Sequence, residues 1–304
     1  MRLLLIDGHY YVYRSFHAIQ TLTNSRGEPT NAIYGFLKTV RKMLKDLQPE
    51  RAAVFWDEGL PEKRLLVQPK YKEQREPMPV TMIPQLDYIR VLCDHLGIVS
   101  IAKPNTEADD LMACYVKDAL KENYQVILAT NDKDLFQLVN EQVWIYSTNK
   151  TDLKSPKDAF ALLGVADVME KWGVPPVGIG EVLALTGDSV DNIPGIEGVG
   201  QKTAAGLIRE FGTIENLLTN LDRVPGLKIR LKLESAREQI LQNREMVRLE
   251  LDHCLTIPIA DLAIRPNYPE LLRALEKCEF KSLLEEVRQE ASRAGTVVQG
   301  ELFG

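Results

Sequence analysis

The sequence predicts an α/β fold in which short strands form a mainly parallel sheet covered by helices. Two observations predict it: the first half of the chain contains four short apolar runs, and amphipathic stretches separate them. Short runs rich in Val, Ile and Leu, bounded by polar or turn residues, are typical of strands buried on both faces. Because strands joined by a helix usually run parallel, the alternating order predicts a parallel sheet.

The elements follow from these patterns in order along the chain. The predicted strands are Arg2–Ile6, Ala52–Trp56, Ile98–Ala102 and Gln125–Ala129. Helical periodicity predicts the helices Asn31–Leu47, Thr81–Leu96, Glu107–Asn123 and Gln201–Phe211, with one or two more within Tyr268–Glu290. We therefore predict an α/β domain over residues 1–154, a helical subdomain over 155–290 and a flexible polar tail over 291–304.

Composition is that of an ordinary globular protein, with 304 residues and 45% hydrophobic residues. No apolar run approaches the roughly 20 residues that cross a bilayer, and Leu3–Ile6 is too short for a signal peptide. We therefore expect a cytoplasmic protein. The four cysteines form no CxxC pair, which favours buried free thiols over zinc or disulfide sites.

Acidic residues recur after the predicted strands and at the start of one predicted helix. In an open parallel sheet, ligands bind beyond the carboxyl ends of the strands, so these side chains are expected to converge on one rim. Two of the acids, Glu107 and Asp110, are spaced three apart and can share a helix face. The whole set is Asp7, Asp57, Glu107, Asp109, Asp110, Asp132, Asp134, Asp188 and Asp191.

Crowded carboxylates repel one another and raise each other's pKa, a cost that a divalent cation removes. Ligands that offer only oxygen favour Mg²⁺ or Mn²⁺, and no His lies within the acidic motifs. Two such ions roughly 4 Å apart can activate a water and stabilise an in-line phosphoryl displacement. Any one of these acids could instead be a helix cap or a turn residue, so the interpretation depends on the set.

The net charge of −6 argues at first against a polyanionic partner. If the nine acids bind metal, however, 34 acidic residues remain against 37 basic ones, a balance of +3. The charge of the whole chain therefore does not exclude a nucleic acid.

The predicted helix Gln201–Phe211 starts within a glycine-rich turn, Pro194–Ala204. Glycines allow close approach of backbone N–H groups to a ligand, and the start of the helix favours an anion. The segment 194–211 is predicted to be a helix–hairpin–helix that grips a nucleic-acid backbone, although an ordinary helix–helix turn is the alternative. The residues expected to bind DNA here are Gly195, Gly198, Gly200, Lys202 and Thr203.

The segment at about 60–80 is charged and rich in proline, which predicts a mobile loop or helical arch. If it is helical, Lys72 and Arg75 share a face, where they could place charge on a scissile phosphate. We also expect Arg64 to contact DNA and Tyr71 to stack on a frayed base. A solvated charged surface is the alternative interpretation of this segment.

Several motifs occur in one order: Asp7–Arg14, Ser25–Pro29, Tyr71–Arg75, Glu107–Asp110, Thr130–Leu135 and Gly187–Asn192. Together with the glycine-rich turn they closely resemble the 5′-nuclease domain of bacterial DNA polymerase I, in the flap-endonuclease family, over residues 1–290. The resemblance implies a PIN-like fold with a helix–three-turn–helix DNA clamp, often occupied by K⁺. It implies that the nine acids hold or surround the metals, that Lys72 and Arg75 contact phosphate, and that Arg14 contacts DNA.

We therefore expect a two-metal 5′-nuclease that cuts DNA near a 5′ end or flap in replication or repair. A PIN-type ribonuclease and a catalytically inactive, structure-specific DNA-binding module are the alternatives. The segment Gln299–Phe303 also resembles the short peptide by which bacterial replication proteins dock on the sliding clamp, which makes the clamp a candidate partner.

Overall fold

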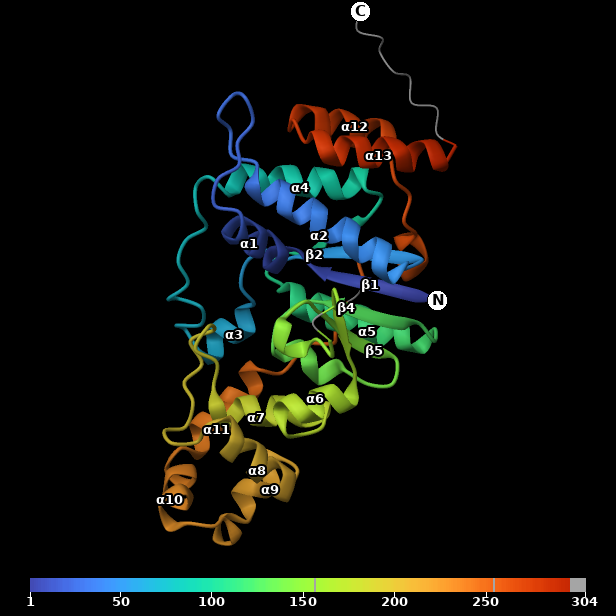
Figure 1. The fold of residues 1–304 in the computed structure, drawn as a ribbon. Helices are drawn as coiled ribbons and strands as arrows, with labels where there is room; N and C mark the ends of the chain where they lie inside the picture. Colours follow the sequence, from blue (N-terminus) through green and yellow to red (C-terminus); the bar gives the residue numbers. More distant parts are fainter. Residues whose placement is uncertain (156, 254, 296–304) are drawn as a thin grey trace, which may run out of the picture. The chain divides into compact units, whose positions relative to one another are not determined.

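The computed structural model describes residues 1–155, 157–253 and 255–295, and these form two compact units (Figure 1). The first unit consists of Met1–Trp56, Pro77–Ile101 and the described part of Thr256–Gly304. The second consists of Asp57–Glu76 and Ala102–Leu255. Because neither unit is continuous in sequence, the boundary predicted at residue 154 stays a prediction. The predicted clamp peptide and Cys254 lie outside the described residues.

The first unit contains strands in the order β3-β2-β1, where β1 is Arg2–Asp7, β2 is Arg51–Trp56 and β3 is Val99–Ala102. The strands β1 and β2 are parallel, with Leu3 opposite Arg51 and Asp7 opposite Phe55. The helices of this unit are α1 (Gly8–Ala18), α2 (Asn31–Leu47), α4 (Ile83–His95), α12 (Tyr268–Lys277) and α13 (Lys281–Arg293), with a short 3₁₀ turn, η5 (Ile259–Leu262).

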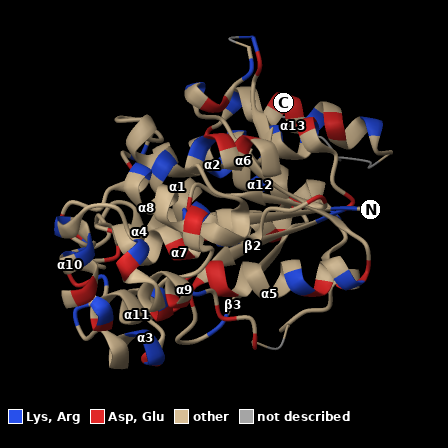
Figure 2. Ribbon diagram, turned by 90° about the horizontal axis from the view of Figure 1, so that it is seen from below, with Lys and Arg blue, Asp and Glu red and all other residues tan. Residues whose placement is uncertain are grey.

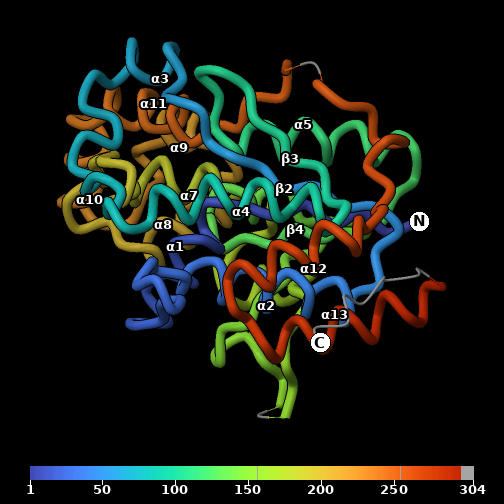
Figure 3. The backbone as a smooth tube through the Cα atoms, turned by 90° about the horizontal axis from the view of Figure 1, so that it is seen from above, coloured from blue at the N-terminus to red at the C-terminus, as the bar shows by residue number. Residues whose placement is uncertain are grey.

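Burial in the first unit follows the apolar pattern. The run Leu3–Ile6 is fully buried, and α2 buries one face that includes Phe36, Leu37 and Val40. The helices α12 and α13 pack side by side (Figure 3), and charged residues recur along α13 (Figure 2). Only glycine fits at position 8, because a Cβ there would lie 2.5 Å from the Trp56 ring. The chain can therefore turn at once from β1 into α1, directly after Asp7.

The second unit contains strands in the order β4-β5-β6, where β4 is Gln125–Ala129, β5 is Val143–Ser147 and β6 is Ala161–Leu163. The pair β4–β5 is parallel and the pair β5–β6 is antiparallel. Its helices are α3 (Glu62–Val67), α5 (Ala108–Lys121), α6 (Val165–Trp172), α7 (Ile179–Thr186), α8 (Gln201–Phe211), α9 (Ile214–Thr219), α10 (Leu227–Ser235) and α11 (Arg237–Met246). Its 3₁₀ segments are η1 (Asp134–Leu138), η2 (Lys150–Asp152), η3 (Pro176–Gly178) and η4 (Leu221–Arg223).

The predicted α/β fold with mainly parallel strands is confirmed, and so are the four predicted strands, to within a residue at each end. The helices Asn31–Leu47 and Gln201–Phe211 have the predicted bounds. In the segment at about 60–80 only Glu62–Val67 is α-helical. Lys72 has a left-handed backbone (φ 57°) and lies in a turn, so the helical face expected for Lys72 and Arg75 is absent from this segment.

Three cysteines of the described residues, Cys93, Cys114 and Cys278, are buried free thiols, as predicted. No helix within residues 1–155, 157–253 and 255–295 is both long enough and apolar enough to cross a membrane.

Candidate metal centre

Three acids meet at the start of α5. Oxygens of Glu107, Asp109 and Asp110 all lie within 4.8 Å of one another. Glu107 is 2% exposed and Asp110 is fully buried. Glu107 stands at the N-cap position of α5, but its side chain makes no capping hydrogen bond. Capping therefore does not explain this buried carboxylate.

Burial and mutual repulsion disfavour the ionised forms of several carboxyl groups at this centre. Burial, and then the neighbouring Asp110 and Glu107, hold the pKa of Asp109 well above its ordinary value. Burial also raises the pKa of Asp110, although a nearby arginine opposes the shift. Burial and the carboxylates of Asp132 and Asp191 hold the pKa of Asp134 well above its usual range. A cluster of carboxylate oxygens that disfavours its own ionisation fits a divalent cation.

Loops bring further acids to the same centre. After β4, the Asp132 carboxylate accepts a hydrogen bond from the Asp134 backbone N–H at 2.9 Å, which fixes the turn into η1. After α7, the backbones of Asp188 and Ile193 exchange hydrogen bonds of 2.9 and 2.8 Å and close a tight loop that carries Asp191. Electrostatic interactions link seven of the nine predicted metal residues: Glu107, Asp109, Asp110, Asp132, Asp134, Asp188 and Asp191.

The other two predicted metal residues make backbone contacts in this structure. Asp57 accepts a hydrogen bond at 2.8 Å from the backbone N–H of Ala108, so it anchors the start of α5. Asp7 belongs to the first unit and caps α1 by accepting from the Tyr10 N–H at 3.0 Å. In this structure Asp7 is therefore a helix cap, and its role as a metal ligand stays a prediction.

Cations of the segment 60–80 contact these carboxylates. The Arg64 guanidinium forms two hydrogen bonds with Asp110, of 2.9 and 3.0 Å, and also pairs with Glu107. Lys72 pairs with Glu107 and lies 3.6 Å from the Asp191 carboxylate. Burial lowers the pKa of Lys72, but the carboxylates of Glu107 and Asp191 outweigh it and raise that pKa.

Arg75 pairs with Asp191 at 2.7 Å, so Lys72 and Arg75 converge on one acid without sharing a helix. Two further hydrogen bonds join their segment to the same loop: the Lys72 N–H donates to the Asp191 carbonyl at 3.2 Å, and the Asn192 amide donates to the Lys70 carbonyl at 2.7 Å. The segment and the Asp188–Asn192 loop therefore form one packed substructure.

Arg64 and Tyr71, which we predicted to contact DNA, are 4% and 3% exposed. The Tyr71 hydroxyl lies 3.1 Å from carboxylate oxygens of both Glu107 and Asp191, and burial together with these carboxylates raises its pKa. Both side chains are buried against the acids in this structure, and their contact with DNA stays a prediction.

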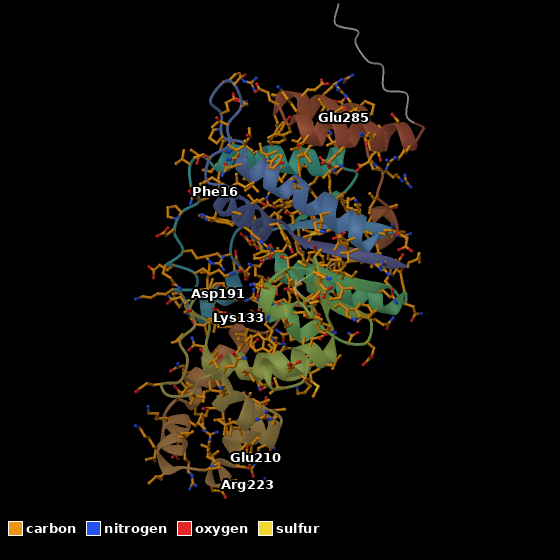
Figure 4. All side chains as sticks on the ribbon, in the orientation of Figure 1. Phe16, Lys133, Asp191, Glu210, Arg223 and Glu285 are labelled. Carbon is orange, nitrogen blue, oxygen red and sulfur yellow. The ribbon has the colours of Figure 1, made fainter. Side chains whose placement is uncertain are left out.

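Lys133 was missing from the predicted site. Its ammonium group pairs with Asp188 at 2.7 Å. Lys133 and Asp191 mark the two loops, after β4 and after α7, in Figure 4. Because Lys133 stands between Asp132 and Asp134 in the sequence, its position in that motif could have identified it.

Two glycines of the glycine-rich turn occupy positions where another residue would clash or be strained. A Cβ at Gly195 would lie 2.0 Å from the Thr186 carbonyl oxygen, and Gly198 has a φ of 81°. The helix α8 begins at Gln201, after the last of these glycines, without a side-chain cap on its first N–H groups. A groove of about 730 Å³ is lined by Gly200, Lys202 and Thr203, so three of the five predicted backbone-binding residues face one hollow. Arg14 lies exposed on α1 in the first unit.

Two family models match the chain: the 5′-3′ exonuclease N-terminal resolvase-like domain over residues 2–173 and the 5′-3′ exonuclease C-terminal SAM fold over residues 174–270. A 5′-3′ exonuclease of Aquifex aeolicus is 35% identical over 287 residues, which is 94% of each chain. The thermostable DNA polymerase I of Thermus filiformis is 41% identical over 288 residues. This chain spans 33% of the length of that polymerase.

Solved structures agree on the fold. The 5′-exonuclease of bacteriophage T5, solved with bound zinc, has a TM-score of 0.68 at 22% identity and covers 96% of this chain and 99% of its own. The catalytic core of Rad2 with a DNA substrate has a TM-score of 0.63 at 18% identity, covering 94% of this chain and 90% of its own. The two family models together account for nearly the whole described chain, and the Aquifex relative matches it almost end to end. The chain therefore belongs to the 5′-3′ exonuclease family.

Proposed function

We propose that this chain is a divalent-metal-dependent, structure-specific 5′-nuclease that hydrolyses DNA phosphodiesters near 5′ ends or 5′ flaps, in replication or repair. The observation that carries the proposal is the buried group of carboxylates around α5, η1 and the Asp188–Asn192 loop, which disfavours its own full ionisation. Similar folds support it: one T5 structure contains divalent zinc, another T5 structure contains DNA and metal ions, and Rad2 was solved with a DNA substrate.

In this proposal the nine acids hold or surround two Mg²⁺ or Mn²⁺ ions. Bound ions of this kind supply an activated water and positive charge for the oxygens of an in-line displacement. When the metal ions bind, the protonation of Asp109 and Asp134 would change most, because burial and neighbouring acids hold their pKa values well above the ordinary range. We include Asp7 among the metal ligands because it lies at the carboxyl end of β1.

Cationic side chains would act on the phosphate. Lys72 and Arg75 both pair with Asp191 here, so a scissile phosphate would replace a carboxylate as their partner. Arg64 would keep its two hydrogen bonds to Asp110 and hold that carboxylate in place. Tyr71 would donate a hydrogen bond from its hydroxyl to Glu107 or Asp191 and fix their orientation.

We further propose that the glycine-rich turn and the start of α8 hold the DNA backbone through N–H groups, Lys202 and Thr203, with a K⁺ ion at the turn and with Arg14 as another contact. Affinity for DNA should then fall as salt rises, because phosphate contacts release counterions. Cytoplasmic location remains our prediction, which buried free thiols support. The sliding clamp likewise remains a proposed partner, through Gln299–Phe303.

A DNA duplex with a labelled 5′ flap tests the proposed function. With Mg²⁺ we expect short labelled products, and with EDTA we expect none. An RNA strand in the same assay distinguishes the alternatives: preferred cutting of RNA would indicate a PIN-type ribonuclease. DNA binding without cleavage in either Mg²⁺ or Mn²⁺ would indicate an inactive DNA-binding module.

A further inference from the structure

Three side chains from α10 and α11 donate hydrogen bonds to backbone carbonyls of the glycine-rich turn. The Gln239 amide donates to the Pro194 carbonyl at 2.8 Å, and the Asn243 amide donates to the same oxygen at 2.8 Å. The Lys232 ammonium donates to the Glu197 carbonyl at 3.0 Å. Since Gln239 and Asn243 are four residues apart on α11, they lie on one helix face directed at the turn.

The bonded carbonyls belong to the Pro194–Gly195 and Glu197–Gly198 peptide groups, so these contacts fix the directions of the N–H groups of Gly195 and Gly198. The N–H groups of Ile196 and Val199 bond to carbonyls of Leu185 and Ile196, each at 2.9 Å. For the N–H groups of Gly195, Glu197, Gly198 and Gly200, the described part of the chain offers no acceptor. With its carbonyls held by α10 and α11, the turn has free donors left for an anion, next to the open start of α8.

Lys232 has a second effect. Its ammonium group also lies 3.2 Å from the Glu197 carboxylate, which is 93% exposed. That carboxylate is the one acidic group within the turn Gly195–Gly200, where it would repel a phosphate. Lys232 therefore offsets an unfavourable charge at the place where the proposed function needs an anion to bind. Basic positions along α10 appear in blue in Figure 2.

We infer that Lys232, Gln239 and Asn243 are positioning residues for DNA binding: they hold the carbonyls of the glycine-rich turn so that its N–H groups face the phosphate backbone. This inference rests on the proposed function, because it assigns residues that act through the DNA-binding turn. It adds residues of α10 and α11 to the DNA-binding turn, and the glycine motif alone would not identify them.

Gln239→Met is the sharpest test, because it removes the donor without changing charge and keeps a similar side-chain length. We expect binding of a 5′-flap duplex in Ca²⁺ to weaken about fivefold, as for the loss of one net hydrogen bond, with an unchanged melting temperature. Gln289→Met on α13, where the glutamine amide bonds Glu285, is the matched control and should bind like the unaltered protein. Asn243 is 1% exposed and is left intact, because its loss would disturb the core.

Lys232→Met separates positioning from direct contact. If Lys232 acts through the turn, affinity falls but the slope of log affinity against log salt stays the same, and Lys232→Arg restores binding. A slope smaller by about 0.9 would show that Lys232 contacts a phosphate itself, and would overturn its assignment as a positioning residue.

Two failures are distinguishable in these measurements. Equal affinity of Gln239→Met and the unaltered protein would overturn the inference and leave the proposed function standing. Absence of DNA binding by the unaltered protein would overturn both.

Discussion

Replacing Asp132 and Asp134 together by alanine is expected to slow cleavage of a 5′-flap duplex by about 10³-fold or more, while DNA binding persists. A loss of that size corresponds to about 4 kcal/mol of transition-state stabilisation. The two carboxylates lie on the turn after β4 and interact with Asp191, Asp188 and each other. Removing them takes oxygen ligands from the centre of the proposed metal site, at the step where the ions would act.

Binding should survive because the change removes two negative charges and leaves the glycine-rich turn intact. Single-turnover cleavage and fluorescence anisotropy on the same substrate measure the two properties separately. Asp87→Ala with Glu285→Ala is the control, since it removes the same charge from exposed positions of α4 and α13 (Glu285 is labelled in Figure 4). Undiminished cleavage by the Asp132/Asp134 variant would show that these acids are not ligands of catalytic ions.

The second large effect concerns stability. Arg64→Met is expected to destabilise the metal-free protein by about 3–5 kcal/mol, because breaking a buried ion pair leaves its partners without compensation. The Arg64 side chain is 5% exposed and pairs with Glu107 and Asp110, whose side chains are 2% and 1% exposed. Without Arg64 these carboxylates would face each other and Asp109 with less positive charge. Adding Mn²⁺ should recover part of the loss, since the ion supplies charge at the same oxygens.

The neighbouring Lys63 provides the control for Arg64. It lies on the same helix, α3, but its side chain is 77% exposed and pairs with Glu250 at 3.2 Å. Lys63→Met should change stability by no more than about 0.5 kcal/mol, as exposed pairs contribute little. Urea unfolding in EDTA compares the two variants. Equal stability of Arg64→Met and the unaltered protein would mean that the buried pairs do not hold the acids together.

Sequence periodicity predicted the elements that bury one face and are long enough for the pattern of apolar residues to repeat. The helix α2 shows this well, because its buried Phe36, Leu37 and Val40 recur at helical spacing over 17 residues. The strands β5 and β6 were not predicted. The strand β6 has only three residues, too few to show an alternation of apolar and polar side chains. It is an edge strand that pairs antiparallel with β5. The helix α1 was also missed, since it begins directly after β1 with no intervening loop.

The site was predicted in part. Carboxylates placed after strands and at the start of α5 are local features, so the sequence indicated most of the acids that come together. The burial of Arg64 and Tyr71 depends on where the 60–80 segment packs, which a charged and proline-rich pattern cannot show. Lys232, Gln239 and Asn243 were likewise beyond prediction, because they reach the turn from helices about 40 residues away along the chain.

Calorimetric titration of Mn²⁺ into the metal-free protein tests the central claim most directly. We expect saturable uptake at pH 7.5 that the Asp132→Ala, Asp134→Ala variant loses. Burial and neighbouring acids raise the pKa of Asp109 and Asp134, so protons compete with the metal ion for these groups at a higher pH than usual. The affinity for Mn²⁺ should therefore weaken from pH 7.5 to 5.5. No uptake at pH 7.5, or uptake identical in the variant, would contradict the account.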